Sequence, residues 1–208
     1  RASHLIAEDK ESEFNALIQK SYDFTLAIAL PMTVGLICCA PNLITSLCGV
    51  KFENSILPSQ IIAPIILMVA ISNVFGIQVL FPKGKINIVT LCCGIGAVVD
   101  LVLNLCLIPF FSYVGTSIAY LGAEVATTIS MFFIGRKYLP ITYFKKNHLN
   151  YLLGCILMAI VLYAIADLQF STISILILQG CSGIVVYFLV LCVRKDIFLM
   201  QVLSKIKK

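Results

Sequence analysis

Residues 86–135 read INIVTLCCGIGAVVDLVLNLCLIPFFSYVGTSIAYLGAEVATTISMFFIG, and this stretch decides the fold. Its only charged residues are Asp100 and Glu124. A helix needs roughly 20 apolar residues to cross a bilayer, so the stretch is too long for one crossing. The segment IPFFSYVG near its middle contains Pro109 and Gly115, which predict a break between two helices. We therefore expect membrane spans at residues 86–108 and 114–135.

The whole chain has the composition of a membrane protein. Of its 208 residues 60% are hydrophobic and only 12% are charged. A soluble domain has about 25% charged residues, so this chain lacks the charge to cover itself against water. Other uncharged runs of sufficient length predict four further spans, at residues 24–47, 58–82, 149–166 and 171–193. The predicted fold class is all-α: a polytopic transmembrane bundle of six spans.

The lysines and arginines support this topology. All of the 15 lie in residues 1–23, 83–85, 136–148 and 194–208, with the single exception of Lys51. Six crossings place these four segments on one side of the membrane, and the positive-inside rule makes that side the cytoplasm. We therefore expect a plasma (inner) membrane protein with both ends of this chain in the cytoplasm. The net charge of +5 follows from this orientation and needs no nucleic-acid partner.

The two ends predict structures at the membrane surface. Residues 1–23 are expected to form a cytoplasmic connector with an amphipathic helix, capped by Asp9 and with Phe14, Leu17 and Ile18 on one face. Residues 194–208 are expected to form a basic cytoplasmic tail. A solvated connector is the alternative for both segments. The chain begins with Arg1 and its first methionine is Met32, so we expect it to be the C-terminal part of a longer protein.

The cysteines do not predict a metal site or a disulfide framework. All nine except Cys48 lie inside apolar runs, and no CxxC or Cys/His spacing occurs. They are expected to pack as small apolar residues. We expect neither a metal nor a cofactor.

The main polar candidates lie inside the predicted spans. Asp100 and Asn104 are one helical turn apart, and Glu124 is expected at nearly the same depth in the next span. A carboxylate at the centre of a membrane helix costs on the order of 3 kcal/mol, so these groups should face protein or a cavity. One reading is a proton- or sodium-linked site; the other is a protonated carboxyl that bonds between helices. Asn73 and Gln78 are further candidates, more simply explained by hydrogen bonds between helices.

An enzymatic function is not expected from these residues. The predicted outer turns are short, and their only charged groups are Lys51, Glu53 and Asp167. His4 and His148 are isolated, and no catalytic arrangement, metal cluster or phosphate-binding glycine loop is visible. A secondary transporter needs only helices, kinks and a few buried polar groups. The sequence therefore favours transport, with no catalytic residues.

Two segments carry a family resemblance: APIILMVAISNVFGIQVLFPKGK, residues 63–85, and LNLCLIPFFSYVGTSIAYLGAE, residues 103–124. Together with their surroundings, over residues 3–135, they resemble bacterial polysaccharide-biosynthesis flippases of the multidrug/oligosaccharidyl-lipid/polysaccharide exporter superfamily. By this resemblance the chain looks like the last six helices of a protein with twelve to fourteen.

The resemblance also implies a function. Such flippases translocate an undecaprenyl-pyrophosphate-linked oligosaccharide across the plasma membrane for the biosynthesis of surface polysaccharides such as lipopolysaccharide, driven by an ion gradient in the manner of an antiporter. The implied partners are the lipid-linked oligosaccharide, membrane lipids and polysaccharide polymerase machinery. Lys20, Lys83 and Lys85, at the cytoplasmic rim, are the candidate contacts for the anionic headgroup.

Two alternatives stay open. A cation-coupled multidrug exporter of the same superfamily suits a chain whose predicted spans contain two acids, Asp100 and Glu124, but no lysine, arginine or histidine. A membrane assembly subunit that transports nothing is the second alternative.

Overall fold

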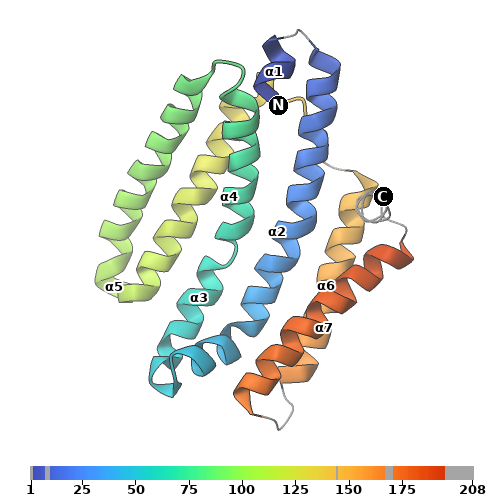
Figure 1. The fold of residues 1–208 in the computed structure, drawn as a ribbon. Helices are drawn as coiled ribbons and strands as arrows, with labels where there is room; N and C mark the ends of the chain where they lie inside the picture. The colour runs from blue at the N-terminus through green and yellow to red at the C-terminus, as the bar shows by residue number, and fades with distance from the viewer. Residues whose placement is uncertain (1, 8–9, 144, 167–170, 195–208) are drawn as a thin grey trace. The chain divides into compact units, whose positions relative to one another are not determined.

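The computed structural model describes residues 2–7, 10–143, 145–166 and 171–194 (Figure 1). Every regular element in this described part is a helix, which confirms the all-α prediction. In chain order the elements are α1 (Ala2–Ala7), α2 (Glu11–Leu47), η1 (Val50–Ser55), α3 (Ile56–Ile62), α4 (Ile65–Asn73), η2 (Val74–Leu80), α5 (Ile86–Gly135), η3 (Arg136–Tyr138), α6 (Lys146–Ala166) and α7 (Thr172–Val193).

Five helical segments of the described residues are long and apolar enough to cross a membrane. They are Glu11–Leu47, Val50–Leu80, Ile86–Tyr138, Asn147–Ala166 and Thr172–Val193. The third of them covers both spans that we expected at residues 86–108 and 114–135, so it provides two crossings only if it reverses. The exact limits of the crossings stay a prediction.

Helix α5 does reverse at Ser112 and forms a hairpin with two antiparallel arms. The 50 residues of α5 would extend about 75 Å as a straight helix, far beyond the ~30 Å hydrocarbon core of a bilayer. Ser112 instead has φ 50° and ψ −128°, a conformation outside the helical region. Figure 1 shows the chain turning back at this point. Pro109 lies inside the first arm, so the break falls three residues after it.

Small residues hold the two arms of the hairpin close together. A Cβ atom on Gly115 would lie 2.7 Å from the Leu107 carbonyl oxygen, and one on Gly122 would lie 2.6 Å from a methyl group of Leu103. Such close approach of helix backbones is typical of membrane bundles, where lipid tails provide no hydrophobic driving force for association. The register of the hairpin follows: positions 103 and 107 of the first arm lie opposite 122 and 115 of the second.

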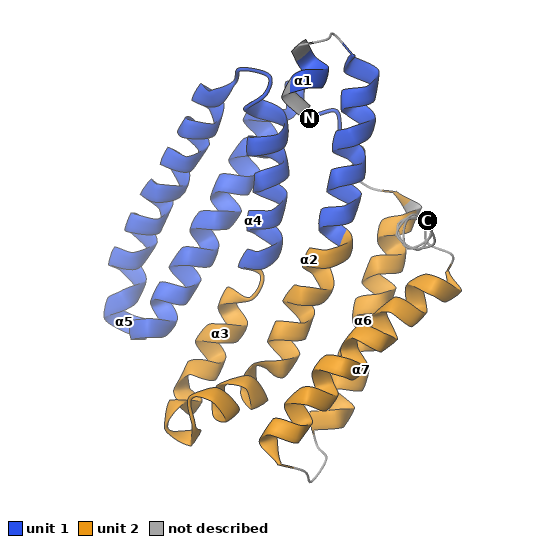
Figure 2. Ribbon diagram, in the orientation of Figure 1, with its two compact units in different colours: residues 1–26, 65–143 blue, residues 27–64, 144–208 orange. Residues whose placement is uncertain are grey.

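The chain divides into two compact units, coloured in Figure 2. Unit 1 contains residues 1–26 and 65–143, and unit 2 contains residues 27–64 and 144–208. In unit 1, the N-terminal part of α2 contributes a stripe of buried side chains, spaced by four residues, to the core. These side chains are Phe14, Ile18, Tyr22 and Leu26.

Residues 11–23 differ from the separate surface helix that we expected. They continue without interruption into α2, which runs from Glu11 to Leu47. The physical reason is that residues 11–30 contain neither glycine nor proline, so nothing ends the helix near residue 23. Leu17 is only half-buried, whereas Phe14 and Ile18 are fully buried. The predicted cap Asp9 and the basic tail beyond Arg194 lie outside the described residues.

The two prolines within α2 each leave a backbone carbonyl without its helical donor, and unit 2 supplies a substitute for both. Pro31 has no N–H to offer the Ala27 carbonyl, four residues earlier, and the Tyr187 hydroxyl of α7 donates to that oxygen at 2.7 Å. The Tyr187 ring packs against Gly154 of α6, where a Cβ atom would lie 2.9 Å from it.

The second proline follows the same rule. Pro41 frees the carbonyl of Ile37, and the Gln60 side-chain amide of α3 donates to it at 3.0 Å. In the bilayer core no water is present to pair with such carbonyls, so these two side chains donate the hydrogen bonds that water would donate elsewhere. Neither donor was expected from the sequence, although the positions of the two prolines specify which carbonyls need one.

We expect Tyr187→Phe to lower the free energy of unfolding by about 1 kcal/mol, because the Ala27 carbonyl loses its donor. In a Pro31→Ala background the restored amide of residue 31 bonds this carbonyl, so Tyr187→Phe should cost less there. Equilibrium unfolding of the purified full chain in mixed detergent measures both costs. Equal costs in the two backgrounds would contradict the role assigned to the hydroxyl.

Candidate functional site

Asp100 and Asn104 lie on the first arm of the α5 hairpin, as the sequence predicts. Both are half-buried, and the Asn104 amide nitrogen donates to the Asp100 backbone carbonyl at 2.9 Å. The Asn104 side-chain oxygen is buried and accepts no hydrogen bond from the residues that the structure describes. An unpaired buried oxygen costs about 1–3 kcal/mol. A water or another hydrogen-bond donor would relieve this cost.

Glu124 lies on the second arm at the level of Asp100. Gly96 lies against Thr127 and near the Ala123 carbonyl, and Leu103 lies against Gly122. Position 100 falls between these contacts on the first arm, so it lies at the level of position 124 on the second. Glu124 is half-buried like Asp100. The hairpin therefore brings the two acids to one depth within a single unit.

Asn73 and Gln78 do not form one group. Asn73 is exposed at the end of α4, whereas Gln78 is half-buried in the π-helical segment η2. The Gln78 side-chain oxygen accepts a hydrogen bond of 2.5 Å from the Ser21 hydroxyl of α2. Gln78 thus joins α2 to η2 within unit 1.

Next to this bond is a cluster of rings that the sequence did not reveal. The Tyr22 ring stacks on Phe75 with 6.2 Å between centroids, and Tyr143 meets both rings edge-on. Burial raises the pKa of the Tyr143 phenol, an effect that Arg136 partly offsets, so this group stays neutral at physiological pH. The cluster packs the segment after η3 against α2 and η2, and we assign it a structural role.

A buried amide pair in unit 2 was missed by the sequence analysis. Gln179 of α7 is completely buried; its side-chain nitrogen donates to the Leu162 carbonyl of α6 at 3.0 Å, and its oxygen accepts from the Asn42 amide at 3.1 Å. This pair connects α2, α6 and α7. A visible signal existed, since Gln179 is the single amide within the apolar run ILILQGCSG, residues 175–183. Its partners could not be predicted, because they come from other helices.

The turn after η2 positions Lys83 and Lys85. Gly84 has φ +68°, its N–H donates to the Phe81 carbonyl at 3.0 Å, and the Lys85 N–H donates to the Leu80 carbonyl at 2.9 Å. These two bonds define a Schellman motif, which ends a helix with a glycine in the left-handed conformation. The turn therefore fixes both lysines between the end of η2 and the start of α5.

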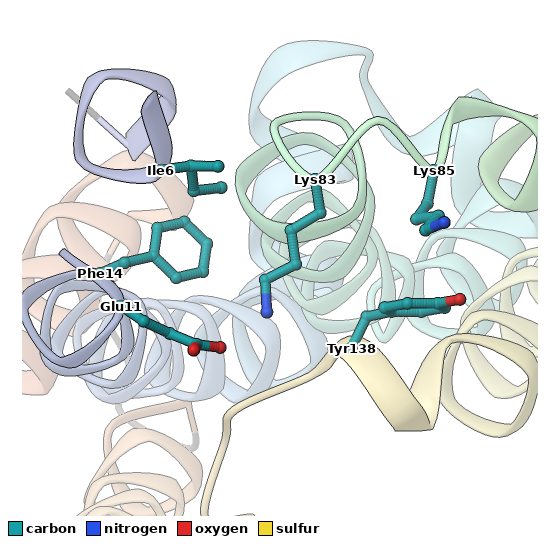
Figure 3. A pocket seen from close by; sticks show the side chains of 6 residues that line it. All are labelled: Ile6, Glu11, Phe14, Lys83, Lys85 and Tyr138. Carbon is teal, nitrogen blue, oxygen red and sulfur yellow. The ribbon is translucent and has the colours of Figure 1, made fainter. Parts of the chain in front are cut away.

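The side chains of these lysines enter one cavity, of about 360 Å³. It is lined by Ile6, Glu11, Phe14, Lys83, Lys85 and Tyr138 (Figure 3). The Lys83 ammonium lies 5.3 Å from the centroid of the Phe14 ring, and the Lys85 ammonium lies 5.1 Å from that of Tyr138. Both distances are within the range of cation–π attraction. All six residues belong to unit 1.

Lys20 does not join the other two candidate cations. It is exposed on α2 and does not line the cavity. The residues that do line it beside the lysines were not chosen from the sequence, because they come from α1, α2 and η3, which are far apart along the chain.

The described residues contain no group of three or more His, Cys, Asp or Glu side chains that could hold a metal ion. The cysteines are all free. The polar groups of the structure are thus suited to hydrogen bonding and to the binding of charge.

Comparison with known proteins gives one informative result. No protein-family model matches the chain, and no curated protein matches it. The solved structure of a lipid II flippase MurJ in its inward closed conformation is similar in fold, with a TM-score of 0.79 and 17% sequence identity. The similarity covers 97% of this chain and 42% of the flippase chain, so this chain spans less than half of that protein's length. The fold and the apolar helices are those of a multi-pass membrane protein.

We expect Gln179→Leu to lower the free energy of unfolding by about 1–2 kcal/mol, because the Asn42 amide then loses its acceptor. A Gln179→Leu/Asn42→Leu double variant should lose less than the sum of the two single variants, since neither partner is then left alone. Unfolding in detergent measures both effects. Gly180→Ala is the matched control, because no atom lies within 4 Å of the added Cβ and the stability should not fall.

Proposed function

We propose that this chain belongs to a flippase that moves an undecaprenyl-pyrophosphate-linked oligosaccharide across the plasma membrane for surface polysaccharide biosynthesis. The observation that carries the proposal is its fold, which resembles that of a lipid II flippase over nearly the whole chain. The two sequence segments that resemble polysaccharide flippases point independently to lipid-linked sugars. The cargo is moved without covalent change, so the protein is not an enzyme.

The proposed driving force is an ion gradient. Asp100 and Glu124, at one depth in the hairpin of α5, are the groups of unit 1 that suit uptake and release of a proton or sodium ion. The buried oxygen of Asn104 beside Asp100 adds a further acceptor. A purely structural hydrogen bond remains the alternative role of these groups. The proposed orientation has both ends of this chain in the cytoplasm, with polysaccharide polymerase machinery as the partner that receives the cargo.

A cation-coupled multidrug exporter is the second candidate. The observation that favours it is the absence of lysine, arginine and histidine from the predicted spans, which contain two acids. A cationic drug would find favourable charge there, whereas a pyrophosphate would not. Under the flippase proposal, the anionic headgroup must contact cations at the end of the bundle or in parts of the transporter outside this chain.

Deleting the gene tests the main proposal. We expect surface polysaccharide to be lost and undecaprenyl-pyrophosphate-linked oligosaccharide to accumulate on the cytoplasmic leaflet, with recovery of both when the full-length gene is restored. Extraction of lipid-linked sugars and gel analysis of surface polysaccharide measure these effects. Unchanged polysaccharide, together with increased sensitivity to cationic dyes, would favour the exporter instead.

Substitutions of Asp100 separate its two possible roles. We expect Asp100→Ala to reduce polysaccharide export severalfold, because it removes the carboxyl from the half-buried face around Asn104. Asp100→Asn keeps the shape and a side chain that can form hydrogen bonds, so it should retain export if the role is structural and lose it if the carboxyl carries a proton. Export at the wild-type level with both variants would remove Asp100 from the site.

A further inference from the structure

We propose that the cavity around Lys83 and Lys85 binds a phosphate group carried by a lipid. The proposal requires only that the chain lies in a membrane; one arm of its test, with a polyprenyl pyrophosphate, rests on the proposed function. Nothing in the likeness to known structures assigns a ligand to this place. The proposal rests on the charges, the walls and the position of the cavity.

The charge of the cavity favours an anion. Two ammonium groups and one carboxylate, Glu11, line it, which leaves a net positive charge. Neither ammonium forms an ion pair with a carboxylate among the residues of the described part. Both lysines are half-buried, which makes their interaction with an anion stronger than that of exposed side chains. A phosphate offers the oxygen acceptors that ammonium groups require.

The positions of the two ammonium groups are set in advance. The Schellman turn fixes the backbone on both sides of Gly84, and the Phe14 and Tyr138 rings hold the ammonium ends at 5.3 Å and 5.1 Å. Figure 3 shows the Lys83 side chain reaching into the cavity between Glu11 and Tyr138. Because little side-chain freedom is left to lose on binding, the entropic cost of ordering the lysines around an anion is small.

The apolar walls favour a lipid over a free anion. Phe14, which is fully buried, and Ile6, which is half-buried, give the cavity an apolar part, and the lysines and Glu11 give it a charged part. The cavity also lies where η2 ends and α5 begins, at the end of two long apolar helices. The phosphate of a lipid lies at this boundary between hydrocarbon and water. Glu11 adds an acceptor for a hydroxyl next to the phosphate, as found on glycerol or on a sugar.

The chain contains no tryptophan, and this makes the test direct. Tyr138→Trp places a single tryptophan in the cavity of the purified chain, whose emission can be excited apart from that of the tyrosines, and it keeps an aromatic face for Lys85. We expect titration with undecaprenyl pyrophosphate in detergent micelles to change its emission, whereas undecaprenol, which lacks the phosphates, should not. Lys83→Gln and Lys85→Gln in this background should each raise the midpoint about tenfold, and Lys83→Arg should largely preserve it.

Lys20→Gln is the matched control, since it removes the same charge from an exposed position outside the cavity and should leave the midpoint unchanged. Unchanged midpoints for both lysine variants would overturn the proposal, and so would an equal loss with Lys20→Gln. Circular dichroism of each variant establishes that it remains folded. An equal response to inorganic pyrophosphate would show that the lipid part of the proposal is wrong.

Two further titrations identify the source of the phosphate. A response to undecaprenyl pyrophosphate alone supports a cargo site, and a response to phosphatidylglycerol alone supports a site for a membrane lipid. A response to both supports a shared phosphate site. If gene deletion leaves surface polysaccharide unchanged, a response to phosphatidylglycerol can still be observed. If the titration shows no response, loss of polysaccharide on deletion can still be observed, so the two proposals can fail separately.

Discussion

The need to pair every backbone carbonyl inside an apolar bundle constrains unit 2 more than any other single factor. Pro31 and Pro41 each remove a donor from α2, and without water an unpaired carbonyl is costly. The Tyr187 hydroxyl and the Gln60 amide supply the missing donors. These two hydrogen bonds tie α7 and α3 to α2.

Unit 1 is organised by a different constraint, the close approach of small residues. Gly115 and Gly122 let the two arms of α5 touch, and that register then places Asp100 and Glu124 at one depth. The stripe of buried residues on α2, from Phe14 onward, covers the π-helical segment η2 through rings and a serine–glutamine bond. Packing of the two arms thus fixes the positions of Asp100 and Glu124.

The sequence predicted what depends on composition and spacing, and it missed what depends on contacts between distant segments. Hydropathy was sufficient for the helical class, and the pattern around Pro109 for the reversal of α5. The continuity of α2 was missed because a change from polar to apolar residues looks like a boundary, although no residue there ends a helix. Gln179 was missed because its hydrogen-bond partners, the donor Asn42 and the Leu162 carbonyl, come from other helices. The sequence predicted only part of the cavity. Lys83 and Lys85 are neighbours along the chain, on either side of Gly84, but Phe14 and Tyr138 come close to them only in the folded chain.

Charged side chains are unevenly distributed over unit 1. Asp100 and Glu124 lie within the two arms of the α5 hairpin, whereas Lys83 and Lys85 lie in the turn that precedes it. At this turn, Lys83 and Lys85 line one cavity together with Glu11 and with the apolar side chains of Ile6 and Phe14. Unit 1 therefore carries its acids and its two cavity lysines at separate places, the acids within the arms of α5 and the lysines in the turn between η2 and α5.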